Sequence, residues 1–304
     1  MLWSSDAQDG VRPGTSRHGS SVRVTFWGVR GSIPTPGSDT RRWGGNSSCL
    51  EVRHEGADPL VLDCGTGARG LGRKLLSEPG RSLDLLFTHL HMDHVFGLPF
   101  FLPIYTPGFD VRITVPAFSP TDARAKLARY LNGVYHPTRL RDLADGVTFH
   151  AIRSGRSLSK GPLQIEALSL NHPGGSLGYR VTGGGRAVAY ITDTAPFARP
   201  GEGVEADQSP VAPEQRVIAF LAGCDLIIYD TMYSREEYLE KMTWGHSYPE
   251  YAAALCRAAG CERLVLFHHL PDDSDDELDR RAEQWSTHRE PRVEIAREGQ
   301  TLVV

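Results

Sequence analysis

Short apolar runs recur along the chain, and many alternate with polar residues in the manner of strands. The first is Val22–Trp27, where every second residue is apolar and therefore shares one face of an extended segment. Similar runs predict further strands at residues 48–53, 59–63, 83–88, 111–115, 147–152, 163–170, 176–182, 187–192, 225–230 and 263–267. Gly183–Gly185 predicts a hairpin turn, and residues 292–304 are expected to be extended.

Helical patterns fall between these strands, mostly in the second half of the chain. They predict helices at residues 68–76, 121–131, 215–222, 249–260 and 275–285. Strands that cluster first and then alternate with helices predict an α/β (α+β) fold in which helices flank sheets in layers. We expect one domain over residues 22–304, preceded by a disordered tail over residues 1–21, which is polar and rich in glycine and serine.

Composition narrows the class of protein. Apolar residues make up 40% of the 304 positions and charged residues 23%, which is enough to build a folded core. The formal net charge of -4 leaves no basic surplus to hold a nucleic acid by bulk charge. No apolar run approaches the roughly 20 residues of a membrane span, so no membrane association is expected. The five cysteines form no C-x-x-C pair, which favours reduced thiols and a cytoplasmic location.

The strongest chemical signal is the cluster His89, His91, Asp93 and His94. In an extended segment alternate side chains point the same way, so His89, His91 and Asp93 are expected to share a face. Imidazoles and carboxylates at this spacing are ligands that Zn²⁺, Mn²⁺ and Fe ions accept, and four of them suit a pair of ions. Further candidates follow apolar strands or lie in glycine-bounded loops: His172, Asp193, His246, and either His268 or His269.

The cluster and the run Leu60–Gly67, which contains Asp63, resemble the metallo-β-lactamase-fold hydrolase superfamily. The resemblance spans about residues 22–269. Within the superfamily the chain most resembles the ribonuclease Z and phosphodiesterase-like branch, on three further segments: Gly28–Thr35, Gly178–Arg180 and Gly245–Ser247. The resemblance implies a single-domain, four-layer αββα sandwich with two divalent metal ions, Zn²⁺ above all, at one edge of the sheets.

The resemblance also implies a role for each candidate ligand. The first ion would be held by His89, His91 and His172, the second by Asp93, His94 and His268, with Asp193 bridging both. His268 is preferred to His269 by counting from the preceding strand. Asp63 resembles a buried acid that supports the metal loop by hydrogen bonding.

Two cations that share a hydroxide lower its pKa towards neutrality, so Asp93 and the other ligands serve catalysis by holding the ions. His246 is not needed as a ligand, and we expect it to stabilise the transition state or protonate the leaving group. Asp230 would orient His246, or else cap its strand. Four residues are candidate substrate contacts, although each could equally serve as a loop hydrogen-bonder or in an ion pair: Arg30, Asn46, Arg180 and Ser247.

One departure from the family bears on the substrate. In ribonuclease Z the arm that grips tRNA is inserted between the Gly-Tyr-Arg strand and the bridging aspartate, whereas here only residues 181–191 separate Arg180 from Thr192. This disfavours tRNA 3′ processing and a nucleic-acid partner, and favours a small phosphodiester such as a cyclic nucleotide. Hydrolysis of a lactone or amide is the alternative, since the same nucleophile attacks a carbonyl carbon. The apolar stretch Phe100–Tyr105 could line a pocket, pack in the core or form a homodimer contact.

Overall fold

A computed structural model describes residues 21–304, so the expected tail over residues 1–21 lies almost wholly outside the described residues. The chain forms two mixed sheets of seven strands each. The first sheet has the order β14 (Thr301–Val303), β1 (Arg23–Gly28), β2 (Cys49–Arg53), β3 (Leu60–Leu62), β4 (Ser82–Leu86), β5 (Asp110–Pro116) and β6 (Val147–Ile152). The second has the order β13 (Arg292–Ile295), β12 (Arg263–Phe267), β11 (Leu226–Asp230), β10 (Arg186–Ile191), β9 (Ser176–Gly183), β8 (Leu163–Leu170) and β7 (Ser157–Lys160).

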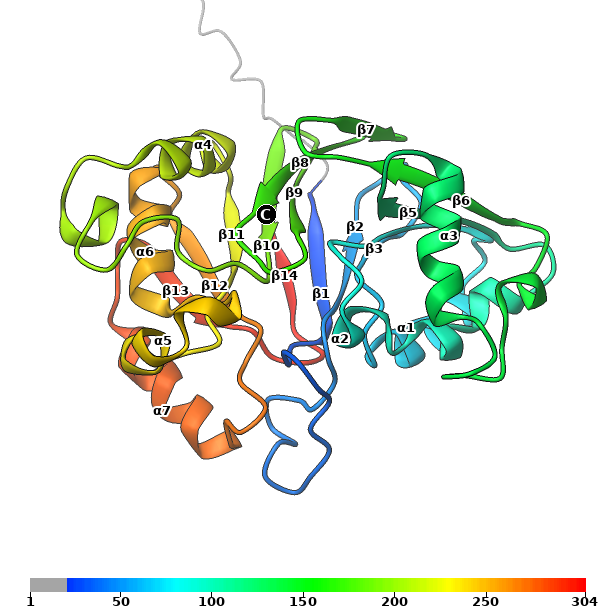
Figure 1. Ribbon diagram of the computed structural model, residues 1–304, viewed down its shortest axis with the longest axis horizontal. Coiled ribbons are helices and arrows are strands. Elements are labelled where there is room, and N and C mark those ends of the chain that lie inside the picture. Colours follow the sequence, from blue (N-terminus) through cyan, green and yellow to red (C-terminus); the bar gives the residue numbers. More distant parts are fainter. Residues whose placement is uncertain (1–20) are drawn as a thin grey trace, which may run out of the picture.

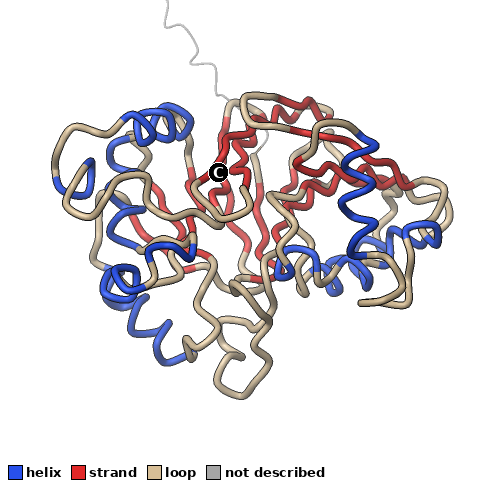
Figure 2. The backbone as a smooth tube through the Cα atoms, in the orientation of Figure 1, coloured by secondary structure: helices blue, strands red, loops and turns tan. Residues whose placement is uncertain are grey.

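Helices lie on the outer side of each sheet, so the strands are enclosed between two helical layers (Figures 1 and 2). The first sheet carries α1 (Ala68–Ser77), α2 (Met92–Val95) and α3 (Pro120–Tyr130). The second carries α4 (Ala212–Leu221), α5 (Arg235–Glu240), α6 (Pro249–Ala258) and α7 (Asp275–Ser286). Short 3₁₀ turns occur at residues 98–100, 102–105, 140–142, 203–206 and 242–244. The expected αββα sandwich in a single domain is confirmed.

The two sheets are held together by side chains that alternate inward along the strands. Phe26 on β1 lies against Phe267 on β12, with ring centroids 6.1 Å apart, and Tyr190 on β10 meets the same phenyl ring edge-on at 5.5 Å. All three side chains are almost completely buried. The inter-sheet core therefore reaches the strand ends from which the candidate ligands project.

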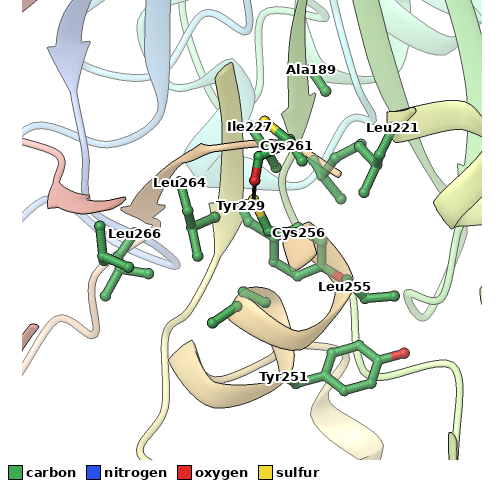
Figure 3. Packing of buried hydrophobic residues seen from close by; sticks show 14 of the residues in the cluster. Ala189, Leu221, Ile227, Tyr229, Tyr251, Leu255, Cys256, Cys261, Leu264 and Leu266 are labelled. Atoms are coloured by element: carbon green, nitrogen blue, oxygen red, sulfur yellow. Dashed lines mark hydrogen bonds between the residues drawn. The ribbon is translucent and has the colours of Figure 1, made fainter. Parts of the chain in front are cut away.

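A separate core joins the helices to the outer face of the second sheet. Figure 3 shows Tyr229, Leu264 and Leu266 from β11 and β12 against Leu255 and Cys256 of α6. The Cys256 thiol donates a hydrogen bond to the carbonyl of Cys261 at 3.2 Å, and all five cysteines are free and buried. Burial on both faces makes β11 and β12 a rigid support for residues at their carboxyl ends.

Some local expectations differ from the structure. The extended C-terminus divides: β13 pairs in parallel with β12, whereas β14 crosses to the first sheet and pairs with β1. Strand β7 and helix α5 were not predicted, because both are short and mostly polar. In the stretch Phe100–Tyr105 the side chains of Phe101 and Ile104 pack in the core, so the homodimer contact stays a prediction. Among residues 21–304, no helix has the length and apolar character needed to cross a membrane.

Candidate metal centre

The candidate ligands follow strands of both sheets and meet at one edge of the sandwich. His89 and His91 follow β4 in the first sheet, whereas His172, Asp193 and His268 follow β8, β10 and β12 in the second. Strands β10, β11 and β12 are parallel to one another, so their carboxyl ends lie at the same edge. The site is therefore assembled from both halves of the fold.

Three histidines form what we call the first triad, namely His89, His91 and His172. Their ligand atoms lie within 4.8 Å of one another, with His172 Nε2 only 3.0 Å from His91 Nδ1. His172 Nδ1 is 2.9 Å from the carbonyl of Gly245 and must carry a proton to donate to it. This hydrogen bond leaves Nε2 as the free donor atom, directed at its two partners.

Four side chains form what we call the second quartet, namely Asp93, His94, Asp193 and His268. Asp193 lies at the centre of the site: Oδ1 is 3.0 Å from His94 Nε2, and Oδ2 is 3.3 Å from His268 Nε2. The same Oδ2 lies 3.7 Å from the Nε2 atoms of both His89 and His172 in the first triad. Asp193 is thus the side chain shared by the two groups.

Burial shapes the electrostatics of the site. Burial is the main reason that the pKa of His89 lies well below its usual range. This imidazole is therefore neutral and able to bind a metal ion. Burial would raise the pKa of Asp193, but His268, His94 and His89 outweigh it and hold that pKa well below the usual range. Within the described chain, His89 Nε2 and His268 Nε2 are buried without a hydrogen-bond partner. Buried nitrogen donors of this kind, grouped around anionic carboxylates, fit two divalent metal ions.

Residues outside the two groups hold the ligands in place, and two of them carried no signal in the sequence. Asp63 Oδ2 lies 2.9 Å from His94 Nδ1 and accepts a hydrogen bond from the Tyr190 hydroxyl at 3.0 Å. The Ser48 hydroxyl lies 3.0 Å from His268 Nδ1. Asp63 was expected beside the metal loop on family resemblance alone. Tyr190 and Ser48 are ordinary strand residues, and only the folded chain brings them to the histidines.

Three of these residues have left-handed backbone: Asp63 with φ 60°, Asp193 with φ 48° and His268 with φ 65°. Each comes directly after the last residue of a strand, or one residue later. The left-handed residue turns the chain sharply away from the sheet. The side chain is thereby aimed along the edge, towards the ligands from neighbouring strands.

The expectation that His89, His91 and Asp93 share one extended face is wrong. Strand β4 ends at Leu86, His91 is the N-cap of α2, and Asp93 lies within that helix. The helical turn brings Asp93 beside its neighbour His94, with Oδ2 3.3 Å from His94 Nε2. The main-chain N–H of Ser32 donates to the same oxygen at 2.9 Å. Because the backbone changes from extended to helical within this segment, His89 and His91 belong to the first triad, whereas Asp93 and His94 belong to the second quartet.

His246 lies beside both groups and is held by Asp230. Its ring centroid is 5.3 Å from that of His172 and 5.2 Å from that of His268, and His246 Nδ1 is 2.8 Å from Asp230 Oδ2. Asp230 is itself fixed by main-chain N–H donors from Met232 and Thr194. Burial lowers the pKa of His246, but the charge and hydrogen bond of Asp230 outweigh it and raise this pKa to about 9. The ligand atoms of His246, His172 and Asp193 also lie within 4.8 Å of one another.

Comparison with known proteins bears directly on this arrangement. Residues 59–269 match the family model described as the beta-lactamase superfamily domain, which is more than half of the chain. The chain belongs to the beta-lactamase superfamily. As a member of it, the protein is a metal-dependent hydrolase, and the cluster described above is able to hold its metal ions.

Individual members of the superfamily resemble the chain over most of its length. A ribonuclease Z of Haloarcula marismortui is 27% identical, with 82% of this chain and 86% of that protein covered. The metallo-beta-lactamase fold protein YhfI of Bacillus subtilis has the same fold, with a TM-score of 0.65, 20% identity and coverage of 93% and 100%. Unliganded yeast PDE1 superposes with a TM-score of 0.62 at 15% identity, covering 94% and 100%. The expected resemblance to the ribonuclease Z and phosphodiesterase-like branch of the superfamily is confirmed.

In this beta-lactamase superfamily member, His268 rather than its neighbour lies in the metal cluster. His269 is buried on the other side of the chain, with Nε2 2.7 Å from the carbonyl of Ala296. Gly31 packs closely against His268: a Cβ added at Gly31 would lie 2.6 Å from His268 Cδ2. The opening loop therefore shapes the site through a glycine as well as through the N–H of Ser32.

The structure places the four residues that were expected to contact substrate, and it contradicts this expectation for Arg30. The guanidinium of Arg30 is fully buried and donates to the carbonyls of Gly44, Leu270 and Asp273. Arg180 donates to the carbonyl of Phe220 at the end of α4, on the outer side of the second sheet. The Asn46 amide donates to Glu298 at 2.6 Å, and Ser247 is fully buried. Arg30 and Ser247 thus lie in the interior of the protein, whereas Asn46 and Arg180 are partly exposed and bonded to other parts of the chain.

The contacts of Arg30 give a prediction about stability. We expect Arg30→Ala to lower the free energy of unfolding by about 3 to 5 kcal/mol, because three carbonyls lose their donor in a buried region. Urea denaturation followed by circular dichroism measures this loss. Arg41→Ala, in the same loop but exposed, is the control and should change the stability by less than about 0.5 kcal/mol. Equal effects of the two substitutions would contradict the structural role of Arg30.

Proposed function

We propose that this enzyme is a phosphodiesterase that acts on a small phosphodiester such as a cyclic nucleotide, with two divalent metal ions. The observation that carries the proposal is the position of Asp193, whose carboxylate lies between the first triad and the other three members of the second quartet, with His246 alongside. Zn²⁺ is the proposed ion, because imidazole-rich sites suit it, and Mn²⁺ and Fe accept the same ligands. Bound in this way, two ions supply a nucleophile from water and neutralise charge on the phosphoryl oxygens.

The reaction adds water across one P–O ester bond and yields a phosphomonoester and an alcohol. The contact with Asp230 keeps a proton on His246 Nδ1 and turns Nε2 away from that carboxylate. From this position His246 donates the Nε2 proton to the oxygen of the leaving alcohol. Asp63 and Ser48 hold the rings of His94 and His268, so the site is preorganised before substrate arrives.

The size of the substrate is inferred from the connection between β9 and β10. These strands pair directly, from Gly183 with Arg186 to Tyr179 with Tyr190, and are joined by a tight glycine turn. No arm for gripping a large nucleic acid projects from this part of the described chain. Among the relatives, those named ribonuclease Z and PDE1 support a phosphoester substrate. The five free, buried cysteines support a location in the reducing cytoplasm.

The proposal is tested by turnover of bis-p-nitrophenyl phosphate, cyclic nucleotides and a panel of lactones, with the metal content of the same sample measured. We expect hydrolysis of phosphodiesters and two equivalents of metal for each chain. Lactone hydrolysis without phosphodiester hydrolysis would overturn the proposal in favour of carbonyl chemistry. Cleavage of precursor tRNA at rates above those for small diesters would overturn it in favour of tRNA processing.

Removal of the metal ions gives a further prediction. The ligands come from both sheets, so bound ions join the two halves of the sandwich and stabilise only the folded state. Dialysis against a chelator should abolish turnover and lower the stability by about 4 kcal/mol, the value for an ion at a thousandfold excess over its Kd. Differential scanning fluorimetry before and after Zn²⁺ is added back measures the change. An unchanged melting temperature would contradict a metal site shared by the two sheets.

A further inference from the structure

A large cavity opens beside the first triad and extends away from the second quartet. It has a volume of about 1110 Å³, and its lining begins at His89 and His91. His246 and His268 do not line it. Its walls are α3, the turn between β6 and β7, and the glycine loop after β8, on the α3 side of the molecule (Figure 1). The volume exceeds what one phosphate and one ribose fill, because pockets for whole drug-sized ligands measure about 300 to 1,000 Å³.

The cavity, which we call the α3 cavity, is lined by cationic but not by anionic side chains. Four cationic side chains line it, Lys126 and Arg129 from α3 and Arg153 and Arg156 from the β6–β7 turn, and no aspartate or glutamate does. The chain as a whole has 37 acidic and 33 basic residues, so a solvated surface of ordinary composition would mix the two signs. Within the described chain the three arginines form no ion pair with an acidic residue. Their charge is available to a ligand that approaches the metal edge.

Aromatic rings and a free hydroxyl accompany these cations. Phe118 and Tyr135 line the cavity with 80% and 75% of their surfaces exposed, and the guanidinium of Arg153 lies 5.4 Å from the Phe118 ring. The Ser176 hydroxyl is buried in the cavity wall and has no hydrogen-bond partner among residues 21–304. Flat rings beside guanidinium groups suit a nucleobase and a phosphate.

We infer that the α3 cavity binds a second phosphate group and a base of the substrate, so that the preferred substrate is a short nucleotide with a terminal phosphate. The inference rests on the proposed function and narrows it. A cyclic mononucleotide has one phosphate, which must lie at the metal ions and would leave the three arginines of the cavity without an anionic partner. A 5′-phosphorylated dinucleotide has a diester for the metal ions, a terminal phosphate for the arginines and a base for the aromatic rings.

The test measures binding by calorimetry on the full chain purified with its metals. The probe is a dinucleotide in which methylene replaces the scissile ester oxygen, prepared with and without a 5′-phosphate. We expect the 5′-phosphate to tighten binding by about tenfold or more, as charge-assisted hydrogen bonds to phosphate do. Arg153→Gln with Arg156→Gln should remove this gain, whereas Tyr135→Leu should weaken both probes by about fivefold or more.

Arg124→Gln is the matched control, because Arg124 is an exposed arginine of α3 that does not line the cavity. It should keep the full gain from the 5′-phosphate. Equal affinity for the two probes, or a gain that survives the double substitution, would overturn the inference. A tetranucleotide without a terminal phosphate that binds as tightly as the phosphorylated dinucleotide would overturn it in favour of a groove for longer chains. Turnover of bis-p-nitrophenyl phosphate, measured in parallel, tests the proposed function separately from this binding.

Discussion

Asp193→Asn is expected to lower kcat/KM for bis-p-nitrophenyl phosphate by about a thousandfold or more, the scale on which enzymes lose a main source of transition-state stabilisation. The carboxylate of Asp193 lies within 3.7 Å of Nε2 atoms from both groups of ligands. Asparagine keeps the shape but has no negative charge, so the nitrogen donors lose their shared anionic partner. We expect the metal content, measured by inductively coupled plasma mass spectrometry, to fall below two equivalents per chain.

The backbone supplies a control for this substitution. Asp193 has φ 48°, and Asp207 in the exposed turn before α4 has φ 54°. Asparagine adopts this left-handed conformation readily, so both substitutions should preserve the fold. Asp207→Asn should therefore leave activity and metal content unchanged. Full activity of the Asp193→Asn protein with two bound ions would refute the bridging role.

His246→Gln is expected to lower the rate by about 10² to 10⁴ when the leaving group is an alkoxide such as a nucleoside, the usual range for a lost general acid. The loss should be much smaller with p-nitrophenolate, which leaves without protonation. The ring of His246 is directed at the site by Asp230 at 2.8 Å, and it is not part of the second quartet. Steady-state kinetics on a p-nitrophenyl ester and on a dinucleotide compare the two leaving groups.

The comparison of leaving groups separates proton donation from metal binding. If His246 acted chiefly as a ligand together with His172 and Asp193, then both substrates would be affected alike and metal would be lost. Retained metal with an equal loss on both substrates would instead indicate a charge effect on the transition state. Asp230→Asn should reproduce the selective loss in weaker form, because the ring would still be present but less firmly oriented.

The sequence predicts the layers and most of the strands well, since buried strands such as β12 (Arg263–Phe267) are apolar at every position after the first. Prediction from the sequence fails where pairing between strands distant in the chain determines the structure. Residues 292–304 look like one extended segment, yet β13 and β14 pair in different sheets because each completes an edge left open by another strand. The four residues of β7, three of which are polar, form a strand only because β8 pairs with them. Such long-range pairing leaves no trace in local periodicity.

For the site, the sequence predicts residue types better than geometry. The group of histidines after β4 is visible as a spacing, but the turn into α2 that separates Asp93 from His91 is not. Arg30 illustrates the converse error, because an arginine in a loop near a metal motif suggests a phosphate contact. The fold instead buries it completely and uses it to join three loop carbonyls. Burial is a property of the whole fold, and so a polar residue near a motif cannot be assigned from sequence alone.

The left-handed residues at the strand ends have a consequence for engineering. An amino acid other than glycine in this conformation costs about 1 to 2 kcal/mol, and glycine avoids most of that cost. Glycine at Asp63, Asp193 or His268 would relieve this backbone cost, but it would also remove the side chain that makes the hydrogen bonds and polar contacts of the site. The chain therefore accepts a local backbone cost at these positions in order to place three functional side chains. Substitutions intended to raise the thermostability of this enzyme should therefore avoid these three positions and target exposed loops instead.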